Sequence, residues 1–164
     1  MEVVRLLPGD DRSWPLMPEF FRRARGFVEK YLPETNPVLV IDDLKKRWLE
    51  TPFLTGYFLV FDNGGLPFAH MTSWIAESYG RPYVFIYQAY CNKFSQLGPS
   101  AEAVLKQVDV WAKQLNSAIR PENWIRKFEM STWRQENVWI KYFEKMGRKG
   151  SKIRSVIECE LFVG

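Results

Sequence analysis

Apolar residues recur at helical or strand-like spacing along most of the chain, and the spacing changes at clusters of Pro, Gly and Asp. Residues 3–7 form a short strand-like run that ends at Pro8-Gly9-Asp10-Asp11, a turn-forming sequence. Apolar residues then return every three or four positions, which predicts a helix from its N-cap Ser13 to Pro33. The expected apolar face of this helix consists of Leu16, Phe20, Ala24, Phe27 and Tyr31.

A second helix is predicted between Asn36-Pro37 and Thr51-Pro52, because proline suits the first turn of a helix and ends one that it would interrupt. Apolar and charged residues fall on opposite sides of this helix, as in a helix that covers a core. Its apolar side consists of Val38, Ile41, Leu44 and Trp48.

Three successive strands are predicted next. Residues 56–62 and 66–77 flank Asp62-Asn63-Gly64-Gly65, whose residues tolerate the positive φ of a hairpin turn. Residues 78–82 then turn the chain into residues 83–91, a nearly unbroken apolar run. Such a run is typical of a central strand that is covered on both faces.

Helices and strands alternate in the remainder of the chain. Gly98-Pro99-Ser100 begins the clearest helical pattern, with Val104, Val108, Trp111 and Leu115 on one face. Residues 125–132 are strand-like, and residues 136–146 form a helical pattern closed by a glycine. Residues 153–163 alternate in polarity and predict one last strand. The apolar face of the helix before it consists of Val138, Trp139, Tyr142, Phe143 and Met146.

The composition favours one ordered domain. The chain has 164 residues, of which 46% are hydrophobic and 26% charged, a balance typical of a folded protein of this length. We therefore expect a single domain over residues 1–164. The apolar runs are far shorter than the roughly 20 residues of a membrane-spanning helix, and the first residues lack the pattern of a secretory signal. These features predict a cytoplasmic protein without a membrane span.

The few cysteines and histidines predict neither a metal site nor a disulfide. Cys91 and Cys159 lie in apolar strand-like runs, so we expect two buried free thiols. With His70 as its one histidine, the chain cannot assemble a Cys/His zinc site. It also lacks the glycine-rich loops of nucleotide-binding proteins and the nucleophile turn of esterases.

The net charge of +4 suits an anionic partner. Charge alone does not decide between a phosphate-bearing cofactor and a nucleic acid. Lys and Arg are scattered, however, and no basic stripe is interleaved with aromatic residues at the spacing of nucleic-acid-binding proteins. Nucleic acid is therefore the less favoured partner.

Two short segments carry a family resemblance. Directly before the helix that starts at Gly98-Pro99-Ser100, Gln96 and Ala101 match the ends of a loop written Arg or Gln, two residues, Gly, one residue, Gly or Ala, although Pro99 stands at its middle glycine. Near the end of the last helix, Phe143, Lys145 and Gly147 match an aromatic-x-Lys-x-Gly-Phe ending in which Arg148 replaces the phenylalanine. With the order of the elements, these segments resemble the GNAT superfamily of acetyl-CoA-dependent N-acyltransferases over essentially the full chain.

The resemblance implies an α/β fold with a mixed, mostly antiparallel sheet flanked by helices, and transfer of an acetyl group from acetyl-CoA to an amine. Main chain at the end of the central strand would hold the acyl group and the pantetheine arm. The residues so assigned are Tyr90, Cys91 and Asn92. The pyrophosphate would lie at the start of the following helix, where unpaired N–H groups and the helix dipole favour an anion. Gln96, Gly98, Ser100 and Ala101 are assigned to that site, with the N–H groups of Ser100, Ala101 and Glu102 as donors.

Direct transfer also needs groups that accept and return a proton and that stabilise the developing oxyanion. Tyr142 is the candidate acid because it neighbours Phe143, which occupies the place of the tyrosine that acts as acid in many relatives; packing on the apolar helix face is its alternative role. The candidate bases are Glu77, His70 and Glu129. Ser131 and Thr132, at a strand end, are candidates for contact with cofactor or acceptor, and we group Ser131 with Glu77 and Tyr142 as catalytic.

Two other functions stay open. The proline in the loop and the displaced tyrosine also suit a GNAT-fold interaction module without catalysis, and the basic charge suits a nucleic-acid-modifying relative. For the enzyme, the acceptor would be an amine on a small molecule or a protein. Trp133 and Trp139 are either buried or part of a homodimer contact.

Overall fold

The structure is a computed structural model, and it describes residues 1–131, 136–153 and 156–164. The strands are β1 (Glu2–Arg5), β2 (Thr55–Phe61), β3 (Pro67–Ser78), β4 (Arg81–Cys91), β5 (Lys127–Ser131), β6 (Gly150–Ile153) and β7 (Val156–Glu160). The helices are α1 (Ser13–Tyr31), α2 (Pro37–Glu50), α3 (Leu97–Asn116) and α4 (Glu136–Lys145), with short 3-10 turns at Pro52–Leu54, Phe94–Gln96 and Pro121–Asn123.

The strands form a mixed sheet. Within the described residues the seven strands are hydrogen-bonded in the order β1-β2-β3-β4-β5-β7-β6. β4 pairs with β5 in parallel, whereas β1–β2, β5–β7 and β6–β7 are antiparallel. The mixed α/β class that the sequence predicted is therefore confirmed, as is the central place of β4 in the strand order.

The chain divides into two compact units. The first unit consists of Met1–Ser73 and Gln88–Val104, and the second consists of Trp74–Tyr87 and Leu105–Gly164. The strands β3 and β4 and the helix α3 each contribute residues to both units.

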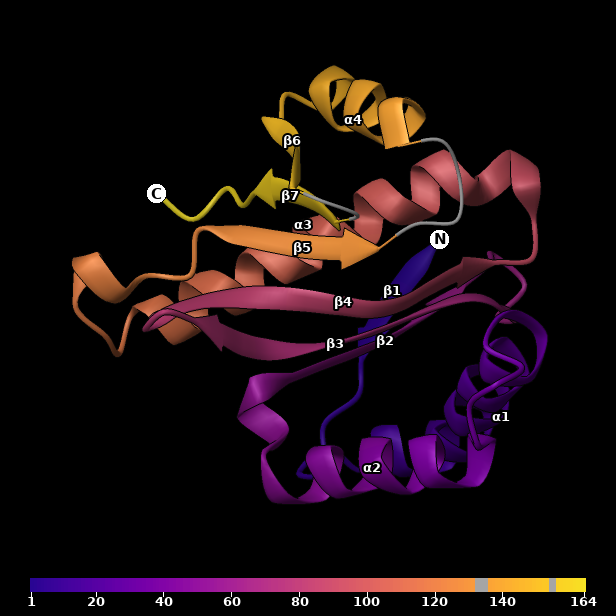
Figure 1. The fold of residues 1–164 in the computed structure, drawn as a ribbon. Coiled ribbons are helices and arrows are strands. Elements are labelled where there is room, and N and C mark those ends of the chain that lie inside the picture. Colours follow the sequence, from indigo (N-terminus) through magenta and orange to yellow (C-terminus); the bar gives the residue numbers. More distant parts are fainter. Residues whose placement is uncertain (132–135, 154–155) are drawn as a thin grey trace. The chain divides into compact units, whose positions relative to one another are not determined.

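Two helices and a fully buried strand build the core of the first unit. α1 and α2 run side by side (Figure 1), and every residue of β2 is buried. The Phe20 ring of α1 stacks on Tyr57 of β2 with centroids 4.9 Å apart. The Tyr57 hydroxyl donates to Leu44 O at 2.8 Å, and Trp48 Nε1 donates to Leu6 O at 3.0 Å. These bonds satisfy polar groups of aromatic side chains that the core would otherwise leave unpaired.

The turns and caps of the first unit follow the sequence signals with one exception. The Asn36 side chain accepts from Val38 N and caps α2, as its position before a proline indicates. In the β2–β3 hairpin, Gly65 adopts a φ of 77°. Ser13, however, does not cap α1: its hydroxyl is buried, accepts from Leu7 N at 2.9 Å and donates to Asp10 Oδ2. The turn before the helix uses the oxygen that a cap would need.

The apolar faces of the helices are rotated slightly from those that the sequence predicted. In α1 the buried residues include Met17 and Val28, whereas Phe27 is only half-buried. Val38 of α2 and Val138 of α4 are exposed, although both belonged to predicted apolar faces. The 3.6-residue period of a helix predicts an apolar stripe but not its exact edges. Whether a residue at an edge of the stripe is buried depends on the element that packs against the helix.

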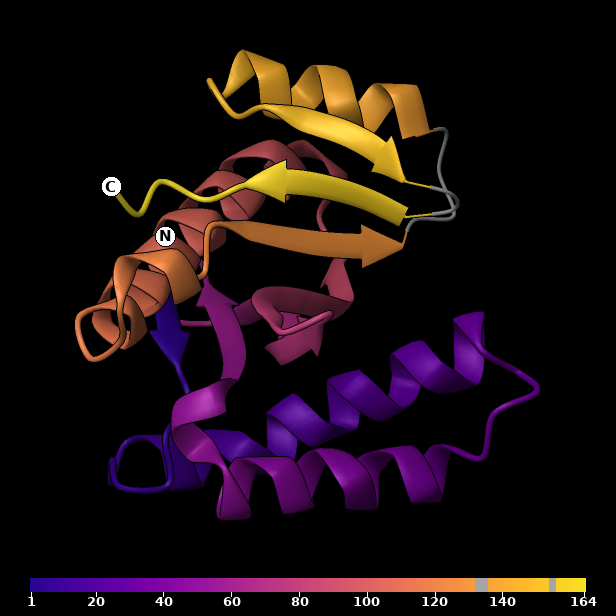
Figure 2. The same cartoon turned by 60° about the vertical axis from the view of Figure 1, so that its left-hand side comes forward.

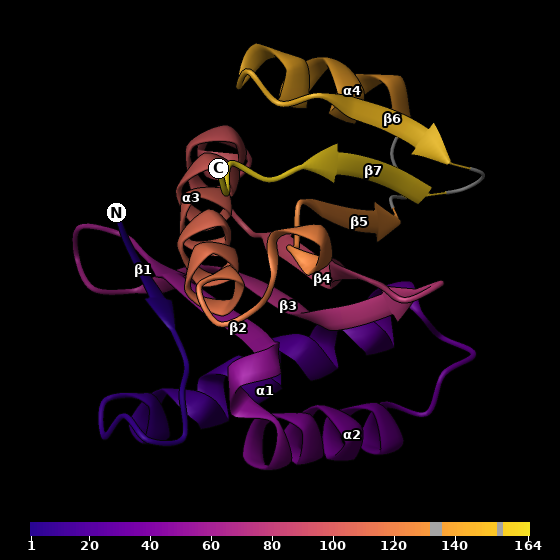
Figure 3. The same cartoon turned by 90° about the vertical axis from the view of Figure 1, so that its left-hand side faces the viewer.

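The second unit packs α4 on a small sheet. In Figures 2 and 3, β5, β7 and β6 follow one another and α4 lies along β6. Phe128 of β5 meets Phe143 of α4 edge to face, with centroids 5.4 Å apart. α4 ends at Gly147, whose φ is 74°, while Arg148 N donates to Phe143 O and Gly147 N donates to Glu144 O. These two bonds and the left-handed glycine form a Schellman motif, which ends the helix where the sequence predicted.

The predicted last strand over residues 153–163 is confirmed only in part. β7 lies within it, but Ile153 belongs to a separate strand, β6, which pairs antiparallel with β7 and was not predicted. Residues 154 and 155 lie outside the described residues. Side chains alternate between faces in both arms of a hairpin, so alternating polarity alone does not reveal where a strand reverses.

The prediction that β4 is covered on both faces is wrong. Val84, Ile86 and Gln88 are buried, whereas Phe85 and Tyr87 between them are half-buried. The uninterrupted apolar run arises because aromatic residues occupy the less covered face, where their rings contact each other and Trp74. Among the described residues, no helix is long and apolar enough to cross a membrane.

Candidate functional site

The predicted cofactor site is one continuous stretch of the first unit. It runs from the end of β4 through the 3-10 turn Phe94–Gln96 into the first turns of α3. Its predicted residues are Tyr90, Cys91, Asn92, Gln96, Gly98, Ser100 and Ala101. Chain continuity therefore keeps the proposed acyl and pyrophosphate ends of the site close together.

Main-chain and thiol hydrogen bonds fix the bend where β4 ends. Asn92 N donates to Phe68 O of β3 at 3.0 Å, which continues the pairing beyond Cys91. The Cys91 thiol donates to Lys93 O at 3.1 Å, and Gln96 N donates to the same carbonyl at 2.9 Å. Both cysteines are free thiols, as predicted, but Cys91 is half-buried and only Cys159 is buried, whereas the sequence predicted both to be buried.

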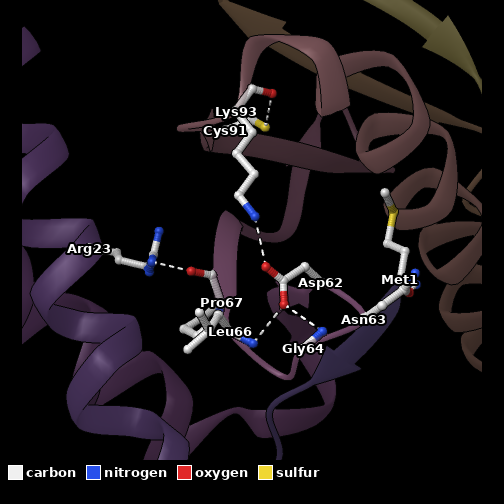
Figure 4. A network of polar contacts seen from close by, with 9 residues as sticks. All are labelled: Met1, Arg23, Asp62, Asn63, Gly64, Leu66, Pro67, Cys91 and Lys93. Atoms are coloured by element: carbon white, nitrogen blue, oxygen red, sulfur yellow. Dashed lines mark hydrogen bonds and ion pairs between the residues drawn. The ribbon is translucent and has the colours of Figure 1, made fainter.

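An ion pair that the sequence analysis missed lies beside this bend. Lys93 Nζ is 2.7 Å from Asp62 Oδ2, while Asp62 Oδ1 accepts from Gly64 N and Leu66 N in the β2–β3 hairpin (Figure 4). Two hydrogen bonds lower the pKa of the Asp62 carboxyl. The bond from Lys93 has the larger effect and the bond from Leu66 N the next largest. Asp62 was recognisable as a turn residue, but no local signal indicated its partner 31 residues later.

The helix α3 starts at Leu97, which moves the predicted donors deeper into the helix. In an α-helix only the first four N–H groups have no partner within the helix. Counted from Leu97, these four positions end at Ser100, so the N–H groups of Ala101 and Glu102 come after them and are not the first-turn donors that the sequence predicted. Pro99 has no N–H group, so one of the four first positions of this helix offers no main-chain donor.

The side chains at this helix start differ in accessibility. Ser100 is only 3% exposed, and its hydroxyl donates to Leu97 O at 3.0 Å, as in a local helix-turn contact. Gln96 is exposed at the end of the 3-10 turn. Of the predicted pyrophosphate residues with polar side chains, Gln96 is thus the one whose side chain can reach a ligand.

Tyr90 belongs to an aromatic cluster of the first unit. Its ring centroid lies 6.1 Å from Tyr31, 6.5 Å from Phe27 and 6.3 Å from His70. Tyr90 is half-buried. This cluster packs the end of β4 against α1.

His70 is a core residue rather than an accessible base. It is 2% exposed, and its Nε2 lies 3.3 Å from Gln88 Oε1. The Gln88 amide group in turn lies 3.4 Å from Ala24 O of α1. Burial lowers the pKa of His70 to about 4, so the ring is neutral at pH 7. The buried Nδ1 atom has no hydrogen-bond partner.

The three predicted catalytic residues belong to the second unit and lie on three different elements. Glu77 is exposed near the end of β3, and Ser131 is exposed at the end of β5, where it pairs with Val156. Tyr142 is half-buried on α4, with ring centroids 6.0 Å from Trp139 and 5.8 Å from Phe143. Thr132 and Trp133, which the sequence analysis also singled out, lie outside the described residues.

Glu129, another candidate base, is held in an ion-pair group. Lys127 Nζ lies 3.3 Å from Glu129 Oε1, contacts the Glu158 carboxylate and sits over the Tyr83 ring. In the described part of the chain, no group of three or more His, Cys, Asp or Glu side chains could hold a metal ion.

A buried ion pair in the second unit escaped the sequence analysis. Arg148 donates to Asp109 of α3 through both terminal nitrogens, at 2.9 Å and 2.6 Å, and the two side chains are 1% and 8% exposed. The guanidinium also donates to Glu160 O and lies 4.2 Å from the Phe162 ring centroid. Arg148, the residue that replaces the phenylalanine of the motif quoted above, therefore has a buried counter-charge.

Comparison with solved structures reveals the same fold. A protein described as a probable acetyltransferase has a TM-score of 0.65 and 14% identity, covering 93% of this chain and 92% of its own. An acetyltransferase of the GNAT family from Staphylococcus aureus Mu50 has a TM-score of 0.61 and 10% identity, covering 98% of both chains. NAA60 of Arabidopsis thaliana, solved with a bisubstrate analogue, has a TM-score of 0.61 and 10% identity, covering 99% of both chains.

The likeness lies in the fold and not in the sequence. The amino-acid sequence matched neither a protein-family model nor a curated protein. At identities of 10–14%, the matching structures establish that this chain has the fold of the GNAT acetyltransferases.

Proposed function

We propose that this protein is an N-acetyltransferase that moves an acetyl group from acetyl-CoA to an amine acceptor by direct transfer. The observation that carries the proposal is the position of residues 90–101, which connect β4, the fourth of the seven described strands in the sheet, to α3. The fold that contains this segment is shared with acetyltransferases. One of those structures holds a bisubstrate analogue, which fits a site for two substrates. The acceptor is an amine of a small molecule or a protein.

In this proposal the chain contributes mainly orientation. Main chain at Tyr90, Cys91 and Asn92 holds the acyl group and the pantetheine arm. The start of α3, with Gln96 and the main chain near Gly98, holds the pyrophosphate. Holding two reactants in line lowers the barrier by removing translational and rotational freedom before the reaction. The amine attacks the thioester carbonyl, the carbon–sulfur bond breaks, and the proton lost by the amine passes to the departing thiolate.

The roles of acid and base stay predictions. Tyr142 is proposed to protonate the thiolate, with Glu77 and Ser131 as the other catalytic candidates. Ser131 and Glu77 have exposed side chains, so both are open to solvent and to an acceptor. Each role is tested by the rate of CoA release, detected with a thiol reagent, in Tyr142→Phe, Ser131→Ala and Glu77→Gln variants once an acceptor is known.

Isothermal titration with acetyl-CoA and with CoA tests the proposal directly. The informative variant is Gln96→Glu, which keeps the size of an exposed side chain and adds one negative charge where the pyrophosphate is proposed to lie. The matched control is Gln107→Glu, the same change at an exposed position in the middle of α3. Ser100→Asp is the poorer probe, because Ser100 is buried and a carboxylate there would test folding.

The transferase proposal is supported if the native protein binds acetyl-CoA with micromolar affinity, Gln96→Glu weakens this binding at least tenfold, and Gln107→Glu leaves it unchanged. This result would justify a screen of amine acceptors. Absence of binding at millimolar acetyl-CoA would refute the proposal.

A GNAT-fold interaction module without catalysis is the second candidate. Pro99 has no N–H group and the buried Ser100 hydroxyl already donates to Leu97 O, which removes two donors from a pyrophosphate site and favours this alternative. The same titration separates the two, because an interaction module binds neither acetyl-CoA nor CoA.

A further inference from the structure

Three residues, Cys91, Asn92 and Lys93, form the corner between β4 and the proposed cofactor segment. Two bonds hold this corner from within: the Cys91 thiol and Gln96 N both donate to Lys93 O, at 3.1 Å and 2.9 Å. A third bond, from Asn92 N to Phe68 O at 3.0 Å, ties it to β3. The direction in which the chain leaves β4 therefore depends on the position of Lys93.

The Lys93 side chain ties the same corner to the β2–β3 hairpin. Its ammonium group lies 2.7 Å from Asp62 Oδ2 (Figure 4). It also lies 5.2 Å from the centroid of the Phe68 ring. Lys93 is 46% exposed and Asp62 25% exposed, so the pair is only partly screened by water. Lys93 thus contacts the hairpin through its ammonium group and the start of the proposed cofactor segment through its carbonyl group.

The β2–β3 hairpin is itself held by hydrogen bonds. Asp62 Oδ1 accepts from Gly64 N at 3.0 Å and from Leu66 N at 2.9 Å, which leaves Oδ2 for Lys93. On the other side, Arg23 of α1 donates to Pro67 O at 2.5 Å (Figure 4). The start of β3 is therefore held from α1 and from the corner at once.

We propose that Asp62 and Lys93 are a positioning pair, which holds the corner and the segment 96–101 in the conformation that binds the cofactor. The inference rests on the proposed function. Neither residue is assigned a contact with the ligand. Asp62 already binds the ammonium group, so a direct contact between Lys93 and a phosphate would have to compete with a charged hydrogen bond.

The alternative role of Lys93, direct binding of an anion, gives the opposite result for Asp62. If the pair positions the corner, Asp62→Asn and Lys93→Met both weaken binding of CoA, and the double variant is no weaker than the worse single variant. If Lys93 binds the anion itself, Asp62→Asn frees the ammonium and leaves affinity unchanged or raises it. The amide side chain of the Asp62→Asn variant would keep the Oδ1 acceptor of the hairpin, so this variant removes the charge and not the turn.

We expect Asp62→Asn and Lys93→Met each to weaken CoA binding about two- to fivefold in isothermal titration, the range of a partly exposed ion pair. Lys93→Arg should restore most of the affinity, because it can still pair with Asp62. The matched control is Asp43→Asn, which breaks the exposed Arg47–Asp43 pair of α2 and should leave CoA affinity unchanged.

Hydrogen exchange of the peptide covering residues 91–101, without ligand, separates this inference from the proposed function. Faster exchange in Asp62→Asn and Lys93→Met, and not in Lys93→Arg or Asp43→Asn, supports the positioning pair even if the native protein binds no CoA, a result that would refute the transferase alone. Unchanged exchange in both variants overturns the positioning pair. So does an Asp62→Asn variant that binds CoA as tightly as the native protein while Lys93→Met binds it more weakly.

Discussion

The buried Arg148–Asp109 pair offers the sharpest test of how the second unit is held together. The change is Asp109→Asn, which keeps the shape of the side chain and removes its charge. The new amide would still offer one oxygen to Phe162 N, which donates to Asp109 Oδ1 at 3.0 Å. Its NH2 group, however, would face a nitrogen of Arg148 that now donates to Asp109 Oδ2 at 2.6 Å. The variant therefore leaves a guanidinium buried without a counter-charge.

The expected cost is large because both side chains are almost fully buried. Removing one partner of a buried ion pair typically destabilises a protein by about 3–5 kcal/mol, since the remaining charge keeps its desolvation cost. For a chain of this length, ~3 kcal/mol corresponds to a melting temperature lower by roughly 6–12 °C. Replacing both partners, in Asp109→Leu with Arg148→Met, should recover most of this loss, because no charge is then buried.

Urea unfolding followed by circular dichroism measures the effect as a change in the free energy of unfolding. Asp43→Asn on α2 is the control, because its partner Arg47 and Asp43 itself are both well exposed and such pairs contribute about 1 kcal/mol or less. A loss below about 1 kcal/mol for Asp109→Asn would refute the reasoning. A double variant no more stable than Asp109→Asn would do so as well, because the loss would then not come from the unpaired charge.

Two further predictions concern buried titratable groups. Burial lowers the pKa of His70 from 6.5 to about 4, so between these pH values the unfolded chain binds a proton that the folded chain does not. The contribution of His70 to stability should therefore fall by about 3 kcal/mol as the pH drops from 6.5 to 4, and is constant above pH 6.5. Urea unfolding at several pH values should show this slope in the native protein and a shallower one in His70→Gln, and equal slopes would contradict the assignment. Burial also raises the pKa of the Cys159 thiol to about 12, whereas Cys91 is half-buried. Ellman's reagent at pH 8 should therefore label Cys91 first and Cys159 only after denaturation, and rapid labelling of native Cys91→Ser would show that Cys159 is accessible.

Much of the fold could be predicted because its signals are local. The helix over Pro37–Glu50 follows from Asn36, Pro37 and a 3.6-residue apolar period, and the β2–β3 hairpin follows from Asp62-Asn63-Gly64-Gly65. Such signals act over a few residues, through φ preferences and side-chain bonds to the nearby main chain. The order of elements that they predict, together with the two motif-like segments at residues 96–101 and 142–148, suggested the GNAT fold.

The sequence determined less of the candidate site. It placed residues 90–101 between a strand and a helix, and the structure has this arrangement. It did not reveal that α3 starts at Leu97 or that the Ser100 hydroxyl is used within the helix, because the start of a helix depends on the turn before it. The assignment of these residues to a cofactor stays a prediction.

The tertiary structure alone decided which distant residues meet. Asp62 and Lys93 are 31 residues apart, and Asp109 and Arg148 are 39 apart, so no local pattern could pair them. The reversal between β6 and β7 was hidden for a related reason, since alternating polarity records which face a side chain takes and not which strand lies beside it. Local propensity thus specified the helices and strands of this protein. Ion pairs, burial and strand pairing depended on contacts between residues far apart in the sequence, which only the tertiary structure defines.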